Sequence, residues 1–180
     1  MSETILVTGA SAGFGQAICR RLVADGYRVI GSARRIDKLQ ALQEELGEAF
    51  YPLQMDVTDL SQVDHALASL PKDWEKVDVL VNNAGLALGL APAYEAEVAD
   101  WLTMIQTNIV GLTYLTRKIL PQMVERNDGY IINLGSTAGT VPYPGANVYG
   151  ASKAFVKQFS LNLRADLAGK KIRVSNIEPG

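Results

Sequence analysis

Short apolar runs, of the kind that form buried strands, alternate along the whole chain with amphipathic stretches of helical length. The predicted strands are residues 4–7, 28–32, 50–54, 77–81, 130–134 and 172–177. The predicted helices are residues 15–24, 36–46, 60–70, 98–126 and 149–167, and Pro121 is expected to kink or break the fourth of them near its end. Strands separated by such helices join through right-handed crossovers into a parallel sheet with helices on both faces. The sequence therefore predicts an α/β, Rossmann-like doubly wound fold, which binds ligands at the carboxyl ends of its strands.

The composition of the chain narrows the classes of function. Its 180 residues suffice for one domain, and a net charge of −2 without a basic run gives no case for binding nucleic acid. No apolar run reaches transmembrane length and the N-terminus carries no signal-like segment, so we expect a cytoplasmic protein that does not enter a membrane. One cysteine, Cys19, and one histidine, His65, exclude a disulfide framework and a metal site rich in these ligands.

A glycine-rich turn follows the first predicted strand and opens the first predicted helix. Glycines in such a turn let the backbone approach a pyrophosphate at the helix N-terminus, where free N–H groups favour an anion. The spacing, Gly-x3-Gly-x-Gly, differs from the usual dinucleotide fingerprint, and a plain tight turn is the alternative. We interpret the turn as a nucleotide-binding segment made of Gly9, Ala10, Ser11, Ala12, Gly13, Phe14 and Gly15.

Two arginines, Arg34 and Arg35, follow the second predicted strand. An NAD site places an acidic residue about twenty positions beyond the glycines to bind the ribose 2′-hydroxyl, but the first acid here is Asp37. A guanidinium group suits a 2′-phosphate instead. The alternative, two solvated arginines at a helix start, is unfavourable because the helix N-terminus is already positive. The predicted cofactor is therefore NADP(H).

The exits of the third and fourth predicted strands carry further candidates for cofactor contacts. Asp56, followed by Val57, can accept a hydrogen bond from an adenine amino group, although a helix-capping role fits the sequence almost as well. Asn83, Ala84 and Gly85 suit a chain that passes close to a ribose, and an ordinary turn is the alternative.

Tyr149 and Lys153 are one turn apart at the start of the last predicted helix, so they share a face. A tyrosine titrates near pH ~10, and a base active near neutral pH needs a positive charge such as the Lys153 ammonium beside it. A surface Tyr–Lys pair on an ordinary helix is the competing interpretation. Ser136 lacks both the hydrolase elbow and a suitably placed base, so its hydroxyl better suits donation to a substrate carbonyl. Asn108 interrupts an apolar helical pattern, a position that usually faces solvent.

Taken together, these motifs resemble the short-chain dehydrogenase/reductase superfamily. TGASAGFG, NNAG, Ser136, YGASK and the terminal Pro179-Gly180 occur in that family's order, across the whole chain. Three longer runs, LPKDWEKVDVLVNNAGLALG, MVERNDGYIINLGSTAG and NVYGASKAFVKQFSLNLRADL, are similar to the bacterial NADP-dependent 3-hydroxy acid dehydrogenases. That subgroup oxidises serine and allo-threonine and reduces malonic semialdehyde.

The resemblance implies a role for each matching residue. Tyr149 would be the general acid/base, and Lys153 would bind the nicotinamide ribose and favour the Tyr149 phenolate. Ser136 would position the substrate oxygen, and Asn108 would maintain a local helix distortion and a water leading to Lys153. The cofactor would contact the glycine turn, Arg34, Arg35, Asp56, Val57, Asn83, Ala84, Gly85, Tyr149, Lys153, Pro179 and Gly180.

Members of the family continue past Pro179-Gly180 through a substrate-covering loop to a final edge strand. We therefore expect residues 1–180 to be a single NADP-binding catalytic domain, truncated after Gly180 and without that strand. The expected substrate is a small 3-hydroxy acid or its keto form, such as serine, allo-threonine, 3-hydroxypropionate or malonic semialdehyde, and the full-length protein is expected to be a homotetramer. The alternatives are another carbonyl substrate on the same machinery and a non-catalytic NADP-binding module.

Overall fold

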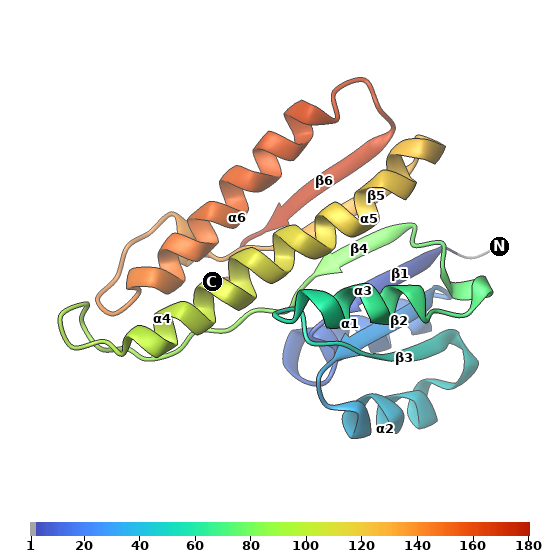
Figure 1. The fold of residues 1–180 in the computed structure, drawn as a ribbon, viewed down its shortest axis with the longest axis horizontal. Helices are drawn as coiled ribbons and strands as arrows, with labels where there is room; N and C mark the ends of the chain where they lie inside the picture. The colour runs from blue at the N-terminus through green and yellow to red at the C-terminus, as the bar shows by residue number, and fades with distance from the viewer. Residues whose placement is uncertain (1–2) are drawn as a thin grey trace.

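The computed structural model describes residues 3–180 and contains a six-stranded parallel sheet with helices on both faces (Figure 1). The strands are β1 (Thr4–Thr8), β2 (Arg28–Ala33), β3 (Phe50–Gln54), β4 (Val79–Asn82), β5 (Gly129–Leu134) and β6 (Ile172–Ile177). Their order across the sheet is β3-β2-β1-β4-β5-β6, and every neighbouring pair is parallel. The chain winds outward from β1 to β3, crosses over to β4 and winds out to β6. This confirms the predicted doubly wound, Rossmann-like fold.

Two layers of helices bury the two faces of the sheet. The helices are α1 (Gly13–Ala24), α2 (Ile36–Leu46), α3 (Leu60–Ala68), α4 (Val98–Ile105), α5 (Leu112–Arg126) and α6 (Asn147–Asp166), with a π-helical segment, η3 (Gln106–Gly111), between α4 and α5. Ile5 and Val7 of β1 pack in one core with residues of α1 and α2. Leu6, which points to the other face, packs in a second core with residues of α3, α5 and α6.

The long helical region between residues 98 and 126 is interrupted, but not at Pro121, where the sequence predicts a kink or break. Pro121 does not end the helix, because α5 continues through it to Arg126. The proline removes the helical N–H partner of the Arg117 carbonyl, and both residues are exposed, so water can satisfy that group. The regular α-helix is interrupted instead at η3, which contains Asn108. Asn108 is 1% exposed, so the solvent-facing position that is usual for a polar residue in a helix does not apply to it.

Two helix boundaries differ from the prediction in a way that matters for function. Helix α1 begins at Gly13 rather than at residue 15, so its first turn includes part of the glycine-rich segment. Helix α6 begins at Asn147, so Tyr149 lies within its first turn. Both starts lie at the carboxyl end of the sheet, where the fold is expected to bind a ligand.

Buried polar side chains tie β4 and β5 to the helices beside them. Asn82 Nδ2 donates to Thr116 Oγ1 at 3.0 Å and to Asn133 Oδ1 at 2.9 Å, and Asn133 Nδ2 donates to Ser160 Oγ at 2.9 Å. All four side chains are buried, so a lost partner would leave an unsatisfied group at a cost of about 1–3 kcal/mol. The network fixes α5 and α6 relative to the carboxyl ends of these strands.

Candidate active site

Two adjoining cavities of about 240 Å³ each lie at the carboxyl edge of the sheet, and Gly85 and Leu86 line both. Cavity A lies at the exits of β1, β2 and β3; its lining includes Gly9, Ser11, Arg34, Arg35, Asp56, Thr58 and Thr107. Cavity B lies at the exits of β4, β5 and β6; its lining includes Phe14, Asn83, Ser136, Tyr149, Lys153 and Pro179. They meet between β1 and β4, where the strand order reverses, which is the usual ligand site of a doubly wound sheet.

The glycine turn brings the N-terminus of α1 to both cavities. Gly9 adopts a φ of +70°, and a Cβ on Gly15 would lie 2.2 Å from the Gly9 carbonyl oxygen, so the turn can pack on the helix only with glycine there. Ala12, at the N-cap, provides no side-chain hydrogen bond to the first turn. The first backbone N–H groups of α1 therefore remain free to bind an anion.

The hydroxyl of Thr8 holds the exit of β4 against the glycine turn. Its oxygen accepts hydrogen bonds from the backbone N–H of Asn83 at 3.0 Å and of Ala84 at 2.9 Å. The Asn83 amide donates in turn to the Thr8 carbonyl at 2.8 Å. These contacts fix the segment that lines both cavities, which distinguishes it from an ordinary exposed turn.

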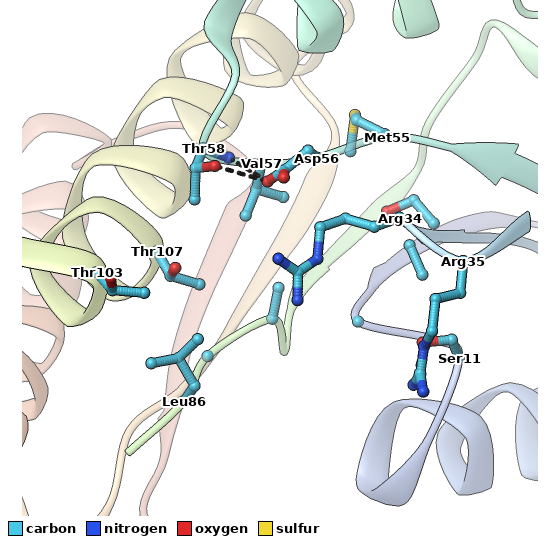
Figure 2. Close-up of a pocket in the computed structure, with 15 residues that line it drawn as sticks. Ser11, Arg34, Arg35, Met55, Asp56, Val57, Thr58, Leu86, Thr103 and Thr107 are labelled. Carbon is cyan, nitrogen blue, oxygen red and sulfur yellow. Dashed lines mark hydrogen bonds between the residues drawn. The ribbon is translucent and has the colours of Figure 1, made fainter. Parts of the chain in front are cut away.

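Arg34 and Arg35 lie at the exit of β2, where Figure 2 shows Arg34 pointing into cavity A and Arg35 beside Ser11. Arg35 Nη2 donates to Ser11 Oγ at 3.0 Å. Both arginines are exposed, and within residues 3–180 neither forms an ion pair. Their positive charge is therefore available to an anionic ligand in this cavity.

The carboxyl group of Asp56 lies at the rim of cavity A. Its Oδ1 accepts hydrogen bonds from the backbone N–H of Thr58 at 2.9 Å and from the Thr58 hydroxyl at 2.8 Å (Figure 2). The cap of α3 is Asp59, whose carboxyl accepts the Gln62 N–H at 3.0 Å. The helix-capping alternative for Asp56 is therefore wrong.

Tyr149 and Lys153 lie on successive turns of α6 and both line cavity B. Lys153 is only 7% exposed, so the pair is not a surface pair. Its Nζ donates to the Leu134 carbonyl at 2.8 Å and lies 5.8 Å from the centroid of the Tyr149 ring. Burial lowers the pKa of Lys153 from its ordinary value, because desolvation disfavours the ammonium form. A Cβ on Gly85 would lie 3.3 Å from both Lys153 Nζ and Asn108 Oδ1, so the two side chains converge beneath this glycine.

Asn108 joins the start of the segment after β4 to helix α6. It accepts the Leu86 N–H at Oδ1 and donates from Nδ2 to the Leu86 carbonyl, both at 2.9 Å. The same Nδ2 donates to Ser152 Oγ at 3.0 Å, and the Ser152 hydroxyl donates to the Tyr149 carbonyl at 2.7 Å. Asn108 lies within η3, and π-helical turns inside α-helices are frequent at functional sites. The helix distortion that the family resemblance implied is therefore present.

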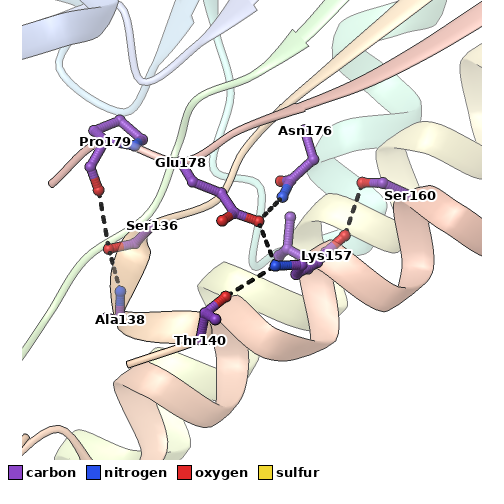
Figure 3. Close-up of polar contacts among 9 residues, drawn as sticks. Ser136, Ala138, Thr140, Lys157, Ser160, Asn176, Glu178 and Pro179 are labelled. Atoms are coloured by element: carbon purple, nitrogen blue, oxygen red, sulfur yellow. Dashed lines mark hydrogen bonds and ion pairs between the residues drawn. The ribbon is translucent and has the colours of Figure 1, made fainter. Parts of the chain in front are cut away.

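Ser136 lines cavity B at the exit of β5. Its oxygen accepts the Ala138 N–H at 3.1 Å, and its hydroxyl has a long contact of 3.4 Å to the Pro179 carbonyl (Figure 3). A contact of this length is weak, so the hydroxyl hydrogen can turn toward a ligand oxygen. His65 lies on α3, outside the lining of both cavities, so no histidine base accompanies Ser136.

Most of the predicted site residues line one of the two cavities. Those in cavity A are Gly9, Ser11, Arg34, Arg35, Asp56, Val57, Ala84 and Gly85. Those in cavity B are Phe14, Asn83, Gly85, Ser136, Tyr149, Lys153, Pro179 and Gly180. Ala10, Ala12, Gly13, Gly15 and Asn108 are absent from both linings. The Ala10 side chain is fully buried, so any contact from this part of the turn would come from its backbone.

Comparisons of the sequence and of the fold with known proteins identify the family. A profile of the short chain dehydrogenase family matches residues 3–180. This chain belongs to that family. Among its relatives, the NADP-dependent 3-hydroxy acid dehydrogenase YdfG of Escherichia coli K12 is 59% identical over 176 residues, which cover 98% of this chain and 71% of that protein. The serine 3-dehydrogenase of Agrobacterium fabrum is 53% identical over 180 residues, which cover 100% of this chain and 72% of that protein.

The fold of this short-chain dehydrogenase also matches that of a solved structure. The structure described as the closed form of serine dehydrogenase complexed with NADP+ aligns with a TM-score of 0.97 and 59% identity. The alignment covers 98% of this chain and 71% of the other. The recognition of the family and of its 3-hydroxy acid dehydrogenase subgroup from sequence motifs is thereby confirmed.

Several residues that shape the site in this family member were missed in the sequence. Thr8 opens the glycine motif and Ser152 lies inside YGASK, so both were inside recognised motifs, yet their hydroxyl groups were given no role. Thr103 and Thr107 line cavity A from α4 and η3. Their spacing of four residues on one helical face is a signal that could have found them.

Proposed function

We propose that this chain is an NADP-dependent dehydrogenase that transfers a hydride between the nicotinamide and a small 3-hydroxy acid or its keto or semialdehyde form. The observation that carries the proposal is the buried Lys153 ammonium beside Tyr149, in a cavity that adjoins the positively charged side chains of Arg34 and Arg35. The identity of 59% to an NADP-dependent 3-hydroxy acid dehydrogenase supports both the cofactor and the substrate class.

The residues at the carboxyl edge fit NADP(H). The 2′-phosphate would be held by Arg34 and Arg35, since a guanidinium group matches a phosphate in charge and hydrogen-bond geometry. The pyrophosphate would bind the uncapped N-terminus of α1 across residues 9–15. Asp56 and Val57 would contact the adenine, residues 83–85 the ribose that follows, and Pro179 and Gly180 the nicotinamide end.

Lys153 has two tasks in this proposal, and its contacts explain how it performs both. Its ammonium would donate to the hydroxyls of the nicotinamide ribose. It would also stabilise negative charge on the neighbouring Tyr149 oxygen, because an opposite charge nearby favours the ionised form of a group. The Leu134 carbonyl fixes the ammonium through a hydrogen bond of 2.8 Å.

Proton transfer would be carried by Tyr149. In the direction of oxidation, its phenolate oxygen takes the proton of the substrate hydroxyl as the carbonyl forms. The Ser136 hydroxyl donates a hydrogen bond to the same substrate oxygen and fixes its position. Asn108 maintains the helix distortion beside Lys153 and supports a water there through which the proton can leave. Bound NADP+ supplies the hydride acceptor.

Two other functions use the same residues. The chain could reduce a different small carbonyl compound, because the Ser136, Tyr149 and Lys153 set does not by itself select a substrate. A non-catalytic NADP-binding module is the second alternative. A pure binder has no need for a serine hydroxyl and a tyrosine in the same cavity, which argues for the enzyme.

The proposal extends to assembly and location. Helices matching α4, α5 and α6 form one dimer contact in the family's tetramers, and the exposed apolar side chains of Leu102, Phe155 and Leu161 on these helices support a homotetramer.

The free thiol of Cys19 supports a reducing compartment such as the cytoplasm. No helix within residues 3–180 combines the length and apolar character needed to span a bilayer. We assign residues 1–180 to one NADP-binding catalytic domain.

A spectrophotometric screen tests the proposed function. The native enzyme is incubated with serine, allo-threonine or 3-hydroxypropionate and either NADP+ or NAD+, and with malonic semialdehyde and either reduced cofactor. The expected result is a change in NADPH absorbance with at least one of these compounds and a much smaller change with the NAD(H) pair. Turnover of none of them, with NADPH binding intact, would favour another carbonyl substrate or the binding module.

A further inference from the structure

Lys157 lies one turn beyond Lys153 on α6. Lys153 points to cavity B, whereas Lys157 points to the segment that leaves β6. Lys157 Nζ donates to Thr140 Oγ1 at 2.9 Å and forms an ion pair with Glu178 Oε1 at 3.3 Å (Figure 3). One side chain thus joins the loop after β5 to the residue just before Pro179.

Asn176 completes this contact from β6. Its Nδ2 donates to Glu178 Oε1 at 2.8 Å, so the carboxyl group of Glu178 accepts from both Asn176 and Lys157 (Figure 3). The Asn176 side chain lies directly over Gly135, where an added Cβ would be 2.6 Å from Oδ1. Among residues 3–180, Oδ1 is buried without a hydrogen-bond partner, so the bond from Nδ2 to Glu178 orients this amide.

The backbone on either side of Glu178 holds the loop that carries Ser136. The Ile177 carbonyl accepts the Gly135 N–H at 2.7 Å, and the Pro179 carbonyl accepts the Thr137 N–H at 3.0 Å. These two bonds continue the β5–β6 ladder past the ends of both strands and enclose Ser136 between them. A shift of Glu178 would therefore move Pro179 and Ser136 together.

We propose that Lys157, Glu178, Asn176 and Thr140 form a clamp that positions Ser136 and Pro179 for the hydride transfer. The proposal rests on the function proposed above and adds Lys157 and Glu178 to it as positioning residues, because neither lines cavity A or cavity B. The side chains of the ion pair are 42% and 28% exposed. An ion pair so exposed contributes little to global stability, so its loss should alter the geometry of the site rather than unfold the protein.

The test compares variants of the native enzyme. Lys157→Met and Glu178→Ala should each lower kcat about tenfold, because a small displacement of Ser136 weakens an interaction with the transition state, while KM for the hydroxy acid changes little. Lys157→Arg should restore most of kcat. The double variant should be no slower than the slower single variant, since both changes break the same contact.

Arg20→Met is the matched control. It removes an ion pair of similar exposure, Arg20–Glu45 at 2.6 Å between α1 and α2, and neither residue lines cavity A or cavity B. Its kcat should equal that of the unmodified enzyme. Unchanged kcat in Lys157→Met and Glu178→Ala, or an equal loss in the control, would overturn the clamp.

Hydrogen exchange provides a readout that does not need turnover. The amide of Thr137 donates to the Pro179 carbonyl, so it should exchange faster in Lys157→Met than in the unmodified enzyme, while the amides of β1 remain unchanged. If the unmodified enzyme turns over no hydroxy acid, the proposed function fails, and this exchange still decides whether the clamp exists. Equal exchange at Thr137 in both proteins would refute it.

Discussion

Asn108 and Leu86 are joined by two reciprocal hydrogen bonds of 2.9 Å, so one side-chain amide satisfies both backbone groups of a residue that follows β4. The pairing requires a group that donates and accepts at once. It is also the point where η3 contacts the lining of both cavities, because Leu86 belongs to each. The position of the cavity wall thus depends on a buried side chain that no ligand would touch.

Asn108→Asp tests this relationship. The substitution keeps the acceptor for the Leu86 N–H but removes the donor to the Leu86 carbonyl and to Ser152 Oγ. We expect a loss of about 1–3 kcal/mol in the free energy of unfolding, because the buried Ser152 hydroxyl and the partly buried Leu86 carbonyl lose their donor. We also expect a fall in kcat, since Ser152 bonds the Tyr149 carbonyl. Urea unfolding and steady-state kinetics measure the two effects.

The control for this substitution is Asn162→Asp, at an exposed position on α6 where the amide contacts only Gln158 among the described residues. It should change the unfolding free energy by a few tenths of a kcal/mol at most. If Asn108→Asp were as mild as this control, the reciprocal pairing would have no structural importance.

Tyr149→Phe removes the proposed proton carrier and keeps the ring. Turnover should fall by at least about a hundredfold, within the range of general acid–base catalysis, while NADPH still binds. Fluorescence titration with NADPH measures binding, and stopped or continuous assays measure turnover. Lys153→Met should weaken both, because the ammonium has a task in each. Substantial turnover in Tyr149→Phe would remove Tyr149 from the mechanism.

Arg34→Ala and Arg35→Ala test the choice of cofactor. Each should weaken NADPH binding about ten- to a hundredfold, the range expected for a charge-assisted hydrogen bond of roughly 1.5–3 kcal/mol. NADH binding should hardly change, because NADH lacks the 2′-phosphate. Arg35→Ala also releases Ser11, so Ser11→Ala serves as the control that separates the lost guanidinium from the lost hydrogen bond of 3.0 Å. Equal affinity of the unmodified enzyme for both cofactors would contradict the assignment.

The sequence predicts most of the site because the relevant residues follow strands in short, local motifs. In a parallel sheet, residues that directly follow strands meet at one edge, so the glycine turn, Arg34, Asn83 and Ser136 can be assigned to one place from the sequence alone. The boundaries of α2, β3 and β6 could be predicted to the residue, since Gly47 ends α2 with a φ of +71° and apolar runs define the strands.

What the sequence does not predict depends on partners that are distant along the chain. A proline is the strongest local signal for a helix break, so the residue pattern alone points to Pro121. The distortion at Asn108 is implied only by the family resemblance, because the contacts of this side chain require Leu86 from another segment. The contact between Lys157 and Glu178 requires the end of β6 to lie beside α6, which only the folded arrangement reveals. The residues next to each position along the chain do not indicate that Asn108 contacts Leu86 or that Lys157 contacts Glu178.

Asp64 should make a pH-dependent contribution to stability. Hydrogen bonds from Lys118 at 2.8 Å and then from Tyr114 at 2.9 Å lower the pKa of its carboxyl group. Because the folded pKa is lowered, the contribution is present above the ordinary pKa near ~3.9 and is lost as the pH falls through the lower, folded value. Asp64→Asn should therefore destabilise the protein by a constant amount between pH 5 and 8, and by less below about pH 4.

Urea unfolding at a series of pH values measures this difference. Asp166→Asn is the control, because Asp166 is exposed and has no side-chain hydrogen bond within residues 3–180. The effect of Asp166→Asn on the free energy of unfolding should not change with pH. A difference between Asp64→Asn and the unmodified protein that stayed constant down to pH 3 would show that the carboxylate charge is not the cause.

Cys19 should be chemically inert in the folded protein. It is fully buried on α1, and desolvation, only partly opposed by the neighbouring Arg20 charge, raises the pKa of its thiol to about 12. At pH 8 its thiolate fraction should be about a thousandfold lower than that of a free cysteine, in addition to the steric block. Iodoacetamide should therefore label Cys19 only as fast as the protein opens, and urea should accelerate the labelling sharply.

The same raised pKa gives a second, independent signature. The folded state keeps the Cys19 proton above the ordinary thiol pKa, where the unfolded chain loses it, so the free energy of unfolding should fall as the pH rises from about 9 toward 12. Cys19→Ala removes the pH-dependent contribution of the thiol. The difference in unfolding free energy between the unmodified protein and this variant should therefore shrink over that range, because the buried thiol stabilises the folded state less as the pH rises. Rapid labelling at pH 8 without denaturant, at the rate of a small free thiol, would show instead that α1 opens from the sheet in the native state.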